Sequence, residues 1–60
     1  MKVVAGTKYI KADMRLEILS REGPDSYKVI VYRPAPGDYT IKTMHLTEIR
    51  HLTNEGWEKL

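Results

Sequence analysis

The chain has 60 residues, of which 10 are basic and 8 acidic, so its net charge is +2 with both histidines neutral. That length allows one small domain, and 42% hydrophobic residues are typical of a globular chain rather than a disordered or collagen-like one. The absence of cysteine excludes disulfide bonds and cysteine-based zinc modules as sources of stability. A domain of this size buries only about 60% of its unfolded surface, so we expect either very consistent local structure or burial against a partner.

The apolar runs of the sequence are too short for a membrane-spanning helix. The longest, residues 3–5 and 29–32, fall far short of the roughly 20 residues that such a helix needs. The first residues also lack the apolar stretch of a signal peptide. We therefore expect a soluble, cytoplasmic protein with no membrane partner.

Residues 1–12 are predicted as an arm or an edge strand, because their short apolar pieces are interrupted at Gly6. Residues 14–21 alternate between apolar and polar side chains, and this period of two predicts a half-buried strand. Its inward face carries three apolar side chains: Met14, Leu16 and Ile18. The turn-forming residues 22–26 end this strand.

Two further strands are predicted in the middle of the chain. Residues 27–33 are rich in β-branched and aromatic side chains on both faces, which is typical of a central strand. Residues 35–38 place proline and glycine at the middle positions of a type II turn, and residues 39–44 resume strand character. Short loops between successive strands predict an antiparallel meander.

The end of the chain changes to a helical period. Thr47 is the expected N-cap and Gly56, followed by Trp57, is the expected C-cap, so a helix is predicted over residues 47–55. Three apolar residues spaced three apart form the stripe expected to pack on the sheet: Leu46, Ile49 and Leu52.

Together these elements predict a single α+β domain over residues 1–60. It begins with an arm or edge strand at residues 1–12 and continues as a small antiparallel β-meander of three to four strands at residues 13–45. One C-terminal helix at residues 47–55 is expected to pack on one face of the sheet.

No motif in the sequence supports catalysis. Neither Ser20 nor Ser26 is tied to a histidine by a local motif, although a nucleophilic serine needs a base within reach. The four glycines are isolated, so they form no phosphate-binding loop. His45 and His51 lie about 120° apart around a helix, whereas a helical zinc pair uses a spacing of four residues. The sequence therefore predicts a non-enzymatic protein with no cofactor and no metal site.

The basic residues are concentrated in the first half of the chain. Seven basic and four acidic residues in 1–33 give +3, whereas three basic and four acidic residues in 34–60 give −1. Strand parity predicts that one sheet face carries Arg15, Lys28, Tyr32 and Lys42, with Lys8 and Lys11 on the adjoining arm. Basic side chains next to an exposed aromatic ring can contact phosphates and stack on bases. The leading hypothesis is therefore a small nucleic-acid-binding or regulatory protein, although an ordinary solvated sheet face would carry the same residues.

The order of elements over residues 14–55 resembles a known class of DNA-binding domain. Three antiparallel strands followed by one helix resemble the small sheet-plus-helix domains at the N-termini of tyrosine integrases. The resemblance implies that the sheet face opposite the helix enters the major groove of DNA. The strands of that family are densely basic, and here Glu17 lowers their positive charge.

A second hypothesis is a protein–protein interaction module, or a small inhibitor of the phage or plasmid type, that docks on a partner protein. The chain has more large apolar side chains than one short helix can cover, and exposed Tyr, Met and Trp are enriched at interfaces. The residues expected near the contact are Ile30, Tyr32, Met44 and Trp57. An unpaired sheet edge also favours pairing with another strand, so this hypothesis includes a homodimer. Alternatively, the N-terminal arm crosses the sheet and covers these side chains.

Overall fold

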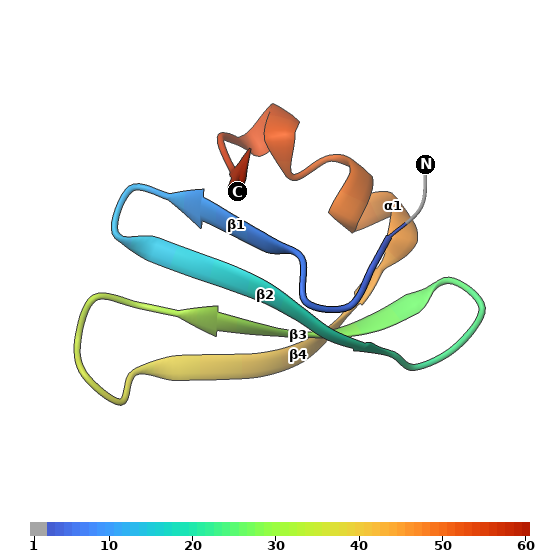
Figure 1. Ribbon diagram of the computed structural model, residues 1–60, viewed down its shortest axis with the longest axis horizontal. Helices are drawn as coiled ribbons and strands as arrows, with labels where there is room; N and C mark the ends of the chain where they lie inside the picture. Colours follow the sequence, from blue (N-terminus) through green and yellow to red (C-terminus); the bar gives the residue numbers. More distant parts are fainter. Residues whose placement is uncertain (1–2) are drawn as a thin grey trace.

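The computed structural model describes residues 3–60 as one antiparallel sheet with a short helical segment on one face (Figure 1). The strand order in the sheet is β4-β3-β2-β1-β5. The strands are β1 (Lys8–Lys11), β2 (Met14–Arg21), β3 (Ser26–Tyr32), β4 (Tyr39–His45) and β5 (Glu58–Lys59). The helical elements are α1 (Leu46–Arg50) and the 3-10 helix η1 (Thr53–Glu55). The α+β class is therefore as predicted.

The sheet has more strands than the predicted three to four. One additional strand is β1, within residues 1–12, which were predicted as an arm or an edge strand. The other is β5, which pairs with β1 beyond the helical segment, so β1 is a strand but not the edge of the sheet. The N–H of Leu60 donates to the carbonyl of Lys8 at 2.9 Å, which continues this pairing to the end of the chain. Because β1 and β5 extend the sheet on one side, the central position belongs to β2 and not to residues 27–33.

Strand β2 has the bounds that its alternation predicts. Leu16 and Ile18 are buried, whereas Arg15, the residue before Leu16, is exposed. A β-bulge between Ile18 and Ser20 shifts the register with β3 and leaves Leu19 outside the regular alternation. Strand β3 is buried on both faces at its centre, which accounts for its continuous apolar sequence.

The tight turn between β3 and β4 also follows the predicted chemistry. The N–H of Asp38 donates to the carbonyl of Ala35 at 3.0 Å, and Gly37 has a φ of 77°. A positive φ at the third residue is the defining feature of a type II turn and favours glycine there. The turn sets Tyr39 directly opposite Tyr32, and this register decides which β4 side chains share each face.

The helical segment differs in detail from the predicted single helix over residues 47–55. Its N-cap is His45 rather than Thr47, because Nδ1 of His45 accepts a hydrogen bond from the Thr47 N–H at 3.1 Å. Glu48 completes a capping box, since its Oε1 accepts from the His45 N–H at 3.1 Å. The α-helix α1 ends at Arg50, and the 3-10 helix η1 begins at Thr53. The predicted C-cap is confirmed, because Gly56 ends η1 with a φ of 97°.

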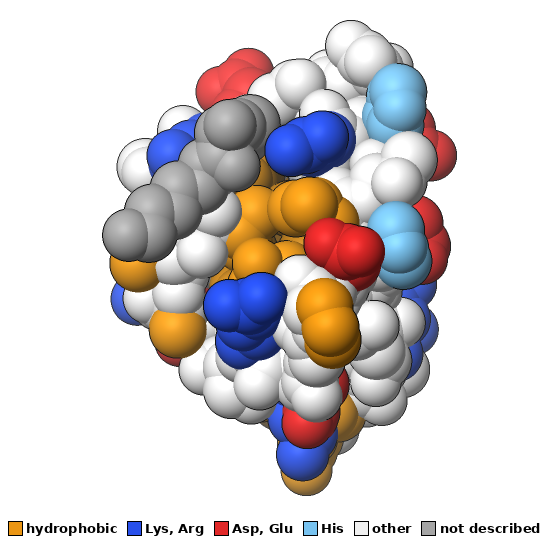
Figure 2. All heavy atoms as spheres, turned by 90° about the vertical axis from the view of Figure 1, so that its right-hand side faces the viewer, with side chains coloured by type: hydrophobic (Ala, Val, Ile, Leu, Met, Phe, Trp, Pro, Cys, Tyr) orange, Lys and Arg blue, Asp and Glu red, His pale blue; other side chains and the backbone are white. Residues whose placement is uncertain are grey.

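The hydrophobic core lies between one sheet face and the helical segment. Its buried members are Tyr9, Leu16, Ile18, Tyr27, Val29, Val31, Met44, Ile49 and Leu52, with Val3, Leu46 and Trp57 packed against them. Viewed from the α1 end, hydrophobic side chains show between charged side chains and the two histidines (Figure 2). The sheet therefore has one face that is covered by the helical segment and one that is not.

Residues 3–7, the described residues before β1, lie near α1 (Figure 1). The N–H of Gly6 donates to the carbonyl of Ile18 at 2.7 Å, and the N–H of Ile18 donates to the carbonyl of Thr7 at 3.0 Å. Val3 packs against the core. The described part of the arm therefore does not cover the opposite face, and residues 1–2 of the predicted arm lie outside the described residues. Within residues 3–60, no helix has the length and apolar character needed to cross a membrane.

Candidate interaction surface

The sheet face turned away from α1 is the candidate functional surface, and we call it the open face. Residues directly opposite each other on neighbouring antiparallel strands point to the same side. The register therefore identifies three rows on this face, alternating with the buried core positions. The first row is Lys8, Glu17, Ile30 and Ile41, the second is Ile10, Arg15, Tyr32 and Tyr39, and the third is Ser20, Lys28 and Thr43.

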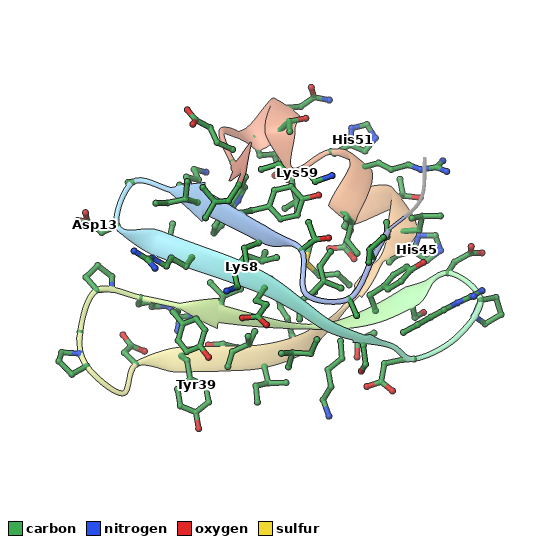
Figure 3. All side chains as sticks on the ribbon, in the orientation of Figure 1. Lys8, Asp13, Tyr39, His45, His51 and Lys59 are labelled. Atoms are coloured by element: carbon green, nitrogen blue, oxygen red, sulfur yellow. The ribbon has the colours of Figure 1, made fainter. Side chains whose placement is uncertain are left out.

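The middle of the open face is apolar. Ile30 is only 7% exposed although it lies outside the core cluster, and it is paired with Ile41, which is 49% exposed. Tyr32 and Tyr39 are opposite each other, with ring centroids 6.1 Å apart and a tilt of 51°. They are 43% and 54% exposed. We call these four residues the apolar stripe. Figure 3 shows Tyr39 on the β4 side of the sheet and Lys8 near its middle.

A shallow hollow of about 270 Å³ adjoins the apolar stripe on the β1 side. Its lining includes the ring of Tyr32 and the terminal Leu60, together with the charged residues Lys8, Arg15 and Glu17. The hollow extends the apolar surface and places both charge signs at its border. It provides room for a side chain of a docked molecule next to the tyrosine pair.

The positive charge of the open face is reduced by nearby carboxylates. Glu17 is directly opposite Lys8 on the neighbouring strand. Lys28 lies 4.0 Å from a carboxylate oxygen of Glu22, with both side chains nearly half exposed. Exposed pairs of this kind contribute little to stability, but they lower the net field that a phosphate backbone would meet. The border of the face is therefore mixed in charge rather than uniformly basic.

Of the six residues predicted to contact nucleic acid, the structure brings four together on the open face: Lys8, Arg15, Lys28 and Tyr32. Lys42 is opposite the buried Val29 and so points to the helix side. The parity prediction for Lys42 is wrong because the register of the β3–β4 hairpin puts odd-numbered β4 residues on the open face. Lys11 is also on the helix side, because its side chain lies next to Gly56 at the end of η1.

The four residues predicted at a protein interface are likewise divided. Ile30 and Tyr32 belong to the apolar stripe, whereas Met44 is buried in the core and Trp57 is half-buried against it. Met44 and Trp57 line a second hollow, between β4 and the helical segment, whose border includes Lys42. Tyr39 and Ile41 are not among the predicted contact residues, although the alternation in residues 39–44 together with the hairpin register places them on the open face.

The histidines take part in local hydrogen bonds. His45 caps α1, and Nδ1 of His51 lies 3.3 Å from Nδ2 of Asn54. Figure 2 shows the two imidazole rings as separate patches. Among residues 3–60, no group of three or more His, Asp or Glu side chains is arranged to hold a metal ion, and no charged or polar residue is buried.

Comparisons with protein-family models, with curated protein sequences and with solved structures find no match to this chain.

Proposed function

We propose that this protein is a non-enzymatic interaction module that docks on a partner protein through its open face. The observation that carries the proposal is the apolar stripe: Tyr32, Tyr39 and Ile41 are each about half exposed, and they surround Ile30 on a sheet face that the helical segment leaves uncovered. Contiguous apolar surface of this kind on a small soluble domain marks a contact site.

The composition of the face supports a protein partner. Tyrosine is strongly enriched among residues that dominate binding energy, and such residues cluster at the centre of an interface. Here the tyrosine pair and the two isoleucines form the centre, whereas Lys8, Arg15 and Glu17 lie at the border. A dry apolar centre with a charged border of both signs is the usual anatomy of a protein interface.

The test removes exposed apolar surface while preserving strand propensity. The double variant Tyr39→Thr with Ile41→Thr keeps side chains that favour strands, because threonine is β-branched. The matched control is Val4→Thr, since Val4 is 55% exposed but lies on the arm. Affinity capture followed by calorimetry with each purified candidate partner compares the three proteins.

We expect the stripe variant to lose at least about tenfold in affinity, as truncation of a central aromatic and its neighbour commonly does. We expect the Val4→Thr control to bind like the wild type. Equal affinity of the wild type and the stripe variant for every captured partner would contradict the proposal.

Nucleic acid is a second candidate partner for the open face. This candidate corresponds to the nucleic-acid-binding or regulatory protein predicted from the sequence. The specific observation is that Lys8, Arg15 and Lys28 share the open face with the ring of Tyr32. Cationic side chains around an aromatic ring can neutralise phosphates and stack on an unpaired base. Glu17 lies on the same face, so the phosphates must bind there despite its negative charge.

Fluorescence anisotropy with labelled duplex DNA, single-stranded DNA and RNA tests this candidate at low salt. A triple variant of Lys8, Arg15 and Lys28 to glutamine should abolish binding, and affinity should fall as salt rises. Lys11→Gln with Lys42→Gln is the matched control, because those two side chains lie on the helix side. Absence of binding at tens of micromolar would rule out nucleic acid as a partner. Equal losses in the two sets of variants would rule out the open face as the surface that binds it.

A further inference from the structure

The outer edge of β4 carries unpaired backbone groups whose positions follow from the hydrogen-bond phase of the β3–β4 ladder. The N–H of Arg33 donates to the carbonyl of Asp38 at 2.9 Å, and the N–H of Leu46 donates to the carbonyl of Asp25 at 2.7 Å. These two bonds lie at the two ends of the β3–β4 ladder, and each joins two residues that are directly opposite each other. They therefore both mark hydrogen-bonded pairs of the same alternating series. Bonding in an antiparallel pair alternates along each strand. The backbone groups of alternate β4 residues therefore point outward, away from β3.

The outward-pointing residues are Tyr39, Ile41 and Thr43, while the residues between them bond to β3. His45 has the same phase, and its N–H indeed donates to the Glu48 side chain instead of to β3. β4 is the last strand on its side of the sheet formed by residues 3–60, as Figure 1 shows. The outward N–H and C=O groups thus form an unpaired edge.

The unpaired stretch is short and centred on Ile41. At one end, the N–H and the carbonyl of Asp38 are both used in the turn. At the other end, the N–H of His45 is used in the helix cap. The stretch bounded by the outward-pointing residues is Tyr39, Thr40, Ile41, Lys42 and Thr43. They include four residues that favour strands and contain no proline and no acidic side chain.

We propose that this edge pairs with the same edge of a second copy, antiparallel, about a two-fold axis through Ile41. Ile41 then lies opposite Ile41 of the second copy, and Tyr39 opposite Thr43. Each outward N–H donates to a carbonyl of the other copy, which is the pairing pattern of an antiparallel ladder. The two sheets become one continuous sheet, and the two apolar stripes meet across the axis because Tyr39 and Ile41 lie on the open face.

The single charge of the edge, Lys42, disfavours a register centred on that residue. A two-fold axis through Lys42 would place two lysines directly opposite each other, and like charges in that arrangement are destabilising. In the register centred on Ile41, Lys42 lies opposite Thr40 and meets no like charge. That register also sets the half-exposed Ile41 side chains opposite each other on the open face, so pairing with a second copy covers apolar surface at the centre of the edge.

Pairing of five residues a side is smaller than a standard interface, so we expect a dimer of about micromolar affinity. The dimer depends on the β4 edge and does not rest on the proposed docking of another protein on the open face. Sedimentation equilibrium over micromolar to millimolar concentrations should show a monomer–dimer equilibrium. A monomer across the whole range would overturn the proposal.

Charge variants at the two-fold axis test the register. Ile41→Lys places like charges opposite each other and should weaken dimerisation at least about tenfold. Ile41→Glu should do the same, whereas an equimolar mixture of the two variants should form a heterodimer. Val4→Lys is the matched control, because it replaces another exposed aliphatic residue away from the edge. A dimer unaffected by Ile41→Lys, or a mixture that stays monomeric, would overturn the proposed axis.

Amide hydrogen exchange on the unaltered protein provides a test that does not depend on the folding of any variant. Raising the protein concentration should slow exchange at Ile41 and Thr43, whose N–H groups point outward. Exchange at Lys42 should change little, because its N–H already bonds to β3. Uniform concentration dependence at all three amides, or none, would contradict edge pairing while leaving the docking proposal intact.

Discussion

Truncation of Ile18 should destabilise the fold far more than truncation of Ile41, and this comparison tests the assignment of the two sheet faces. Both isoleucines lie in strands, so their replacement by alanine removes the same atoms and loses similar strand propensity. Ile18 is fully buried at 0% exposure, whereas Ile41 is 49% exposed. The difference between the two variants therefore reports burial.

The expected magnitudes follow from the exposed fractions. Removing three buried carbons costs about 0.8 kcal/mol each in transfer free energy, or roughly 2.4 kcal/mol for Ile18. The cavity left in the core raises this to about 3 kcal/mol or more. Ile41 loses about half of the transfer contribution, roughly 1 kcal/mol, and no cavity forms because solvent fills the space. The two free energies of unfolding should therefore differ by about 2 kcal/mol.

Equilibrium urea unfolding well below micromolar concentration, where the proposed dimer is dissociated, measures this difference. The single tryptophan, Trp57, is half-buried against the core and provides a fluorescence probe, with far-ultraviolet circular dichroism as an independent one. A 60-residue domain has a total stability of only about 3 to 9 kcal/mol, so Ile18→Val, costing about 1 kcal/mol, provides a milder measurement. Ile18→Ala and Ile41→Ala variants that agree within about 0.5 kcal/mol would refute the assignment of a covered and an open face.

Three local features give further predictions, each measurable by thermal or urea unfolding. Gly56→Ala should cost about 1 kcal/mol or more because Gly56 has a φ of 97°, whereas Gly23→Ala should change stability little because its added Cβ meets nothing closer than 3.9 Å; equal costs would contradict this reasoning. His45→Ala should cost about 1 kcal/mol by removing the N-cap acceptor, and His45→Asn should restore most of it. Arg33→Ala should cost under about 0.5 kcal/mol, because its ion pair with Asp38 is nearly half exposed; a cost above about 1 kcal/mol would show that this pair is structural.

The elements that could be predicted are those specified by neighbouring residues. The alternation of residues 14–21 predicted β2 with its observed bounds, and the proline–glycine pair predicted the type II turn with a positive φ at Gly37. Gly56 was likewise predicted as a left-handed C-cap. Each of these depends on a steric preference of one residue or on a period within one strand, so no distant part of the chain is needed to decide it.

The helical segment shows where a local pattern was insufficient. Apolar residues spaced three apart are compatible with both α and 3-10 geometry, and Leu46, Ile49 and Leu52 reach the core through a combination of the two. Threonine is a common N-cap, so the pattern predicts Thr47, but the imidazole of His45 takes that role. Helix ends are decided by which acceptor reaches the free N–H groups, and more than one neighbouring side chain could do so.

The sequence by itself determined much of the local conformation of this protein: where β2, β3 and β4 lie, which turns join them, and which side chains alternate within β2. Only the tertiary structure decided how those alternations combine into faces. The six-residue connection before Tyr39 sets the β3–β4 register. In that register Lys42 lies on the helix side, whereas Ile41 and Tyr39 lie on the open face with Ile30. A shift of one residue would exchange every side chain of β4 between the two faces. Periodicity fixes relative positions within a strand, whereas the common face depends on pairing with residues far away in the sequence.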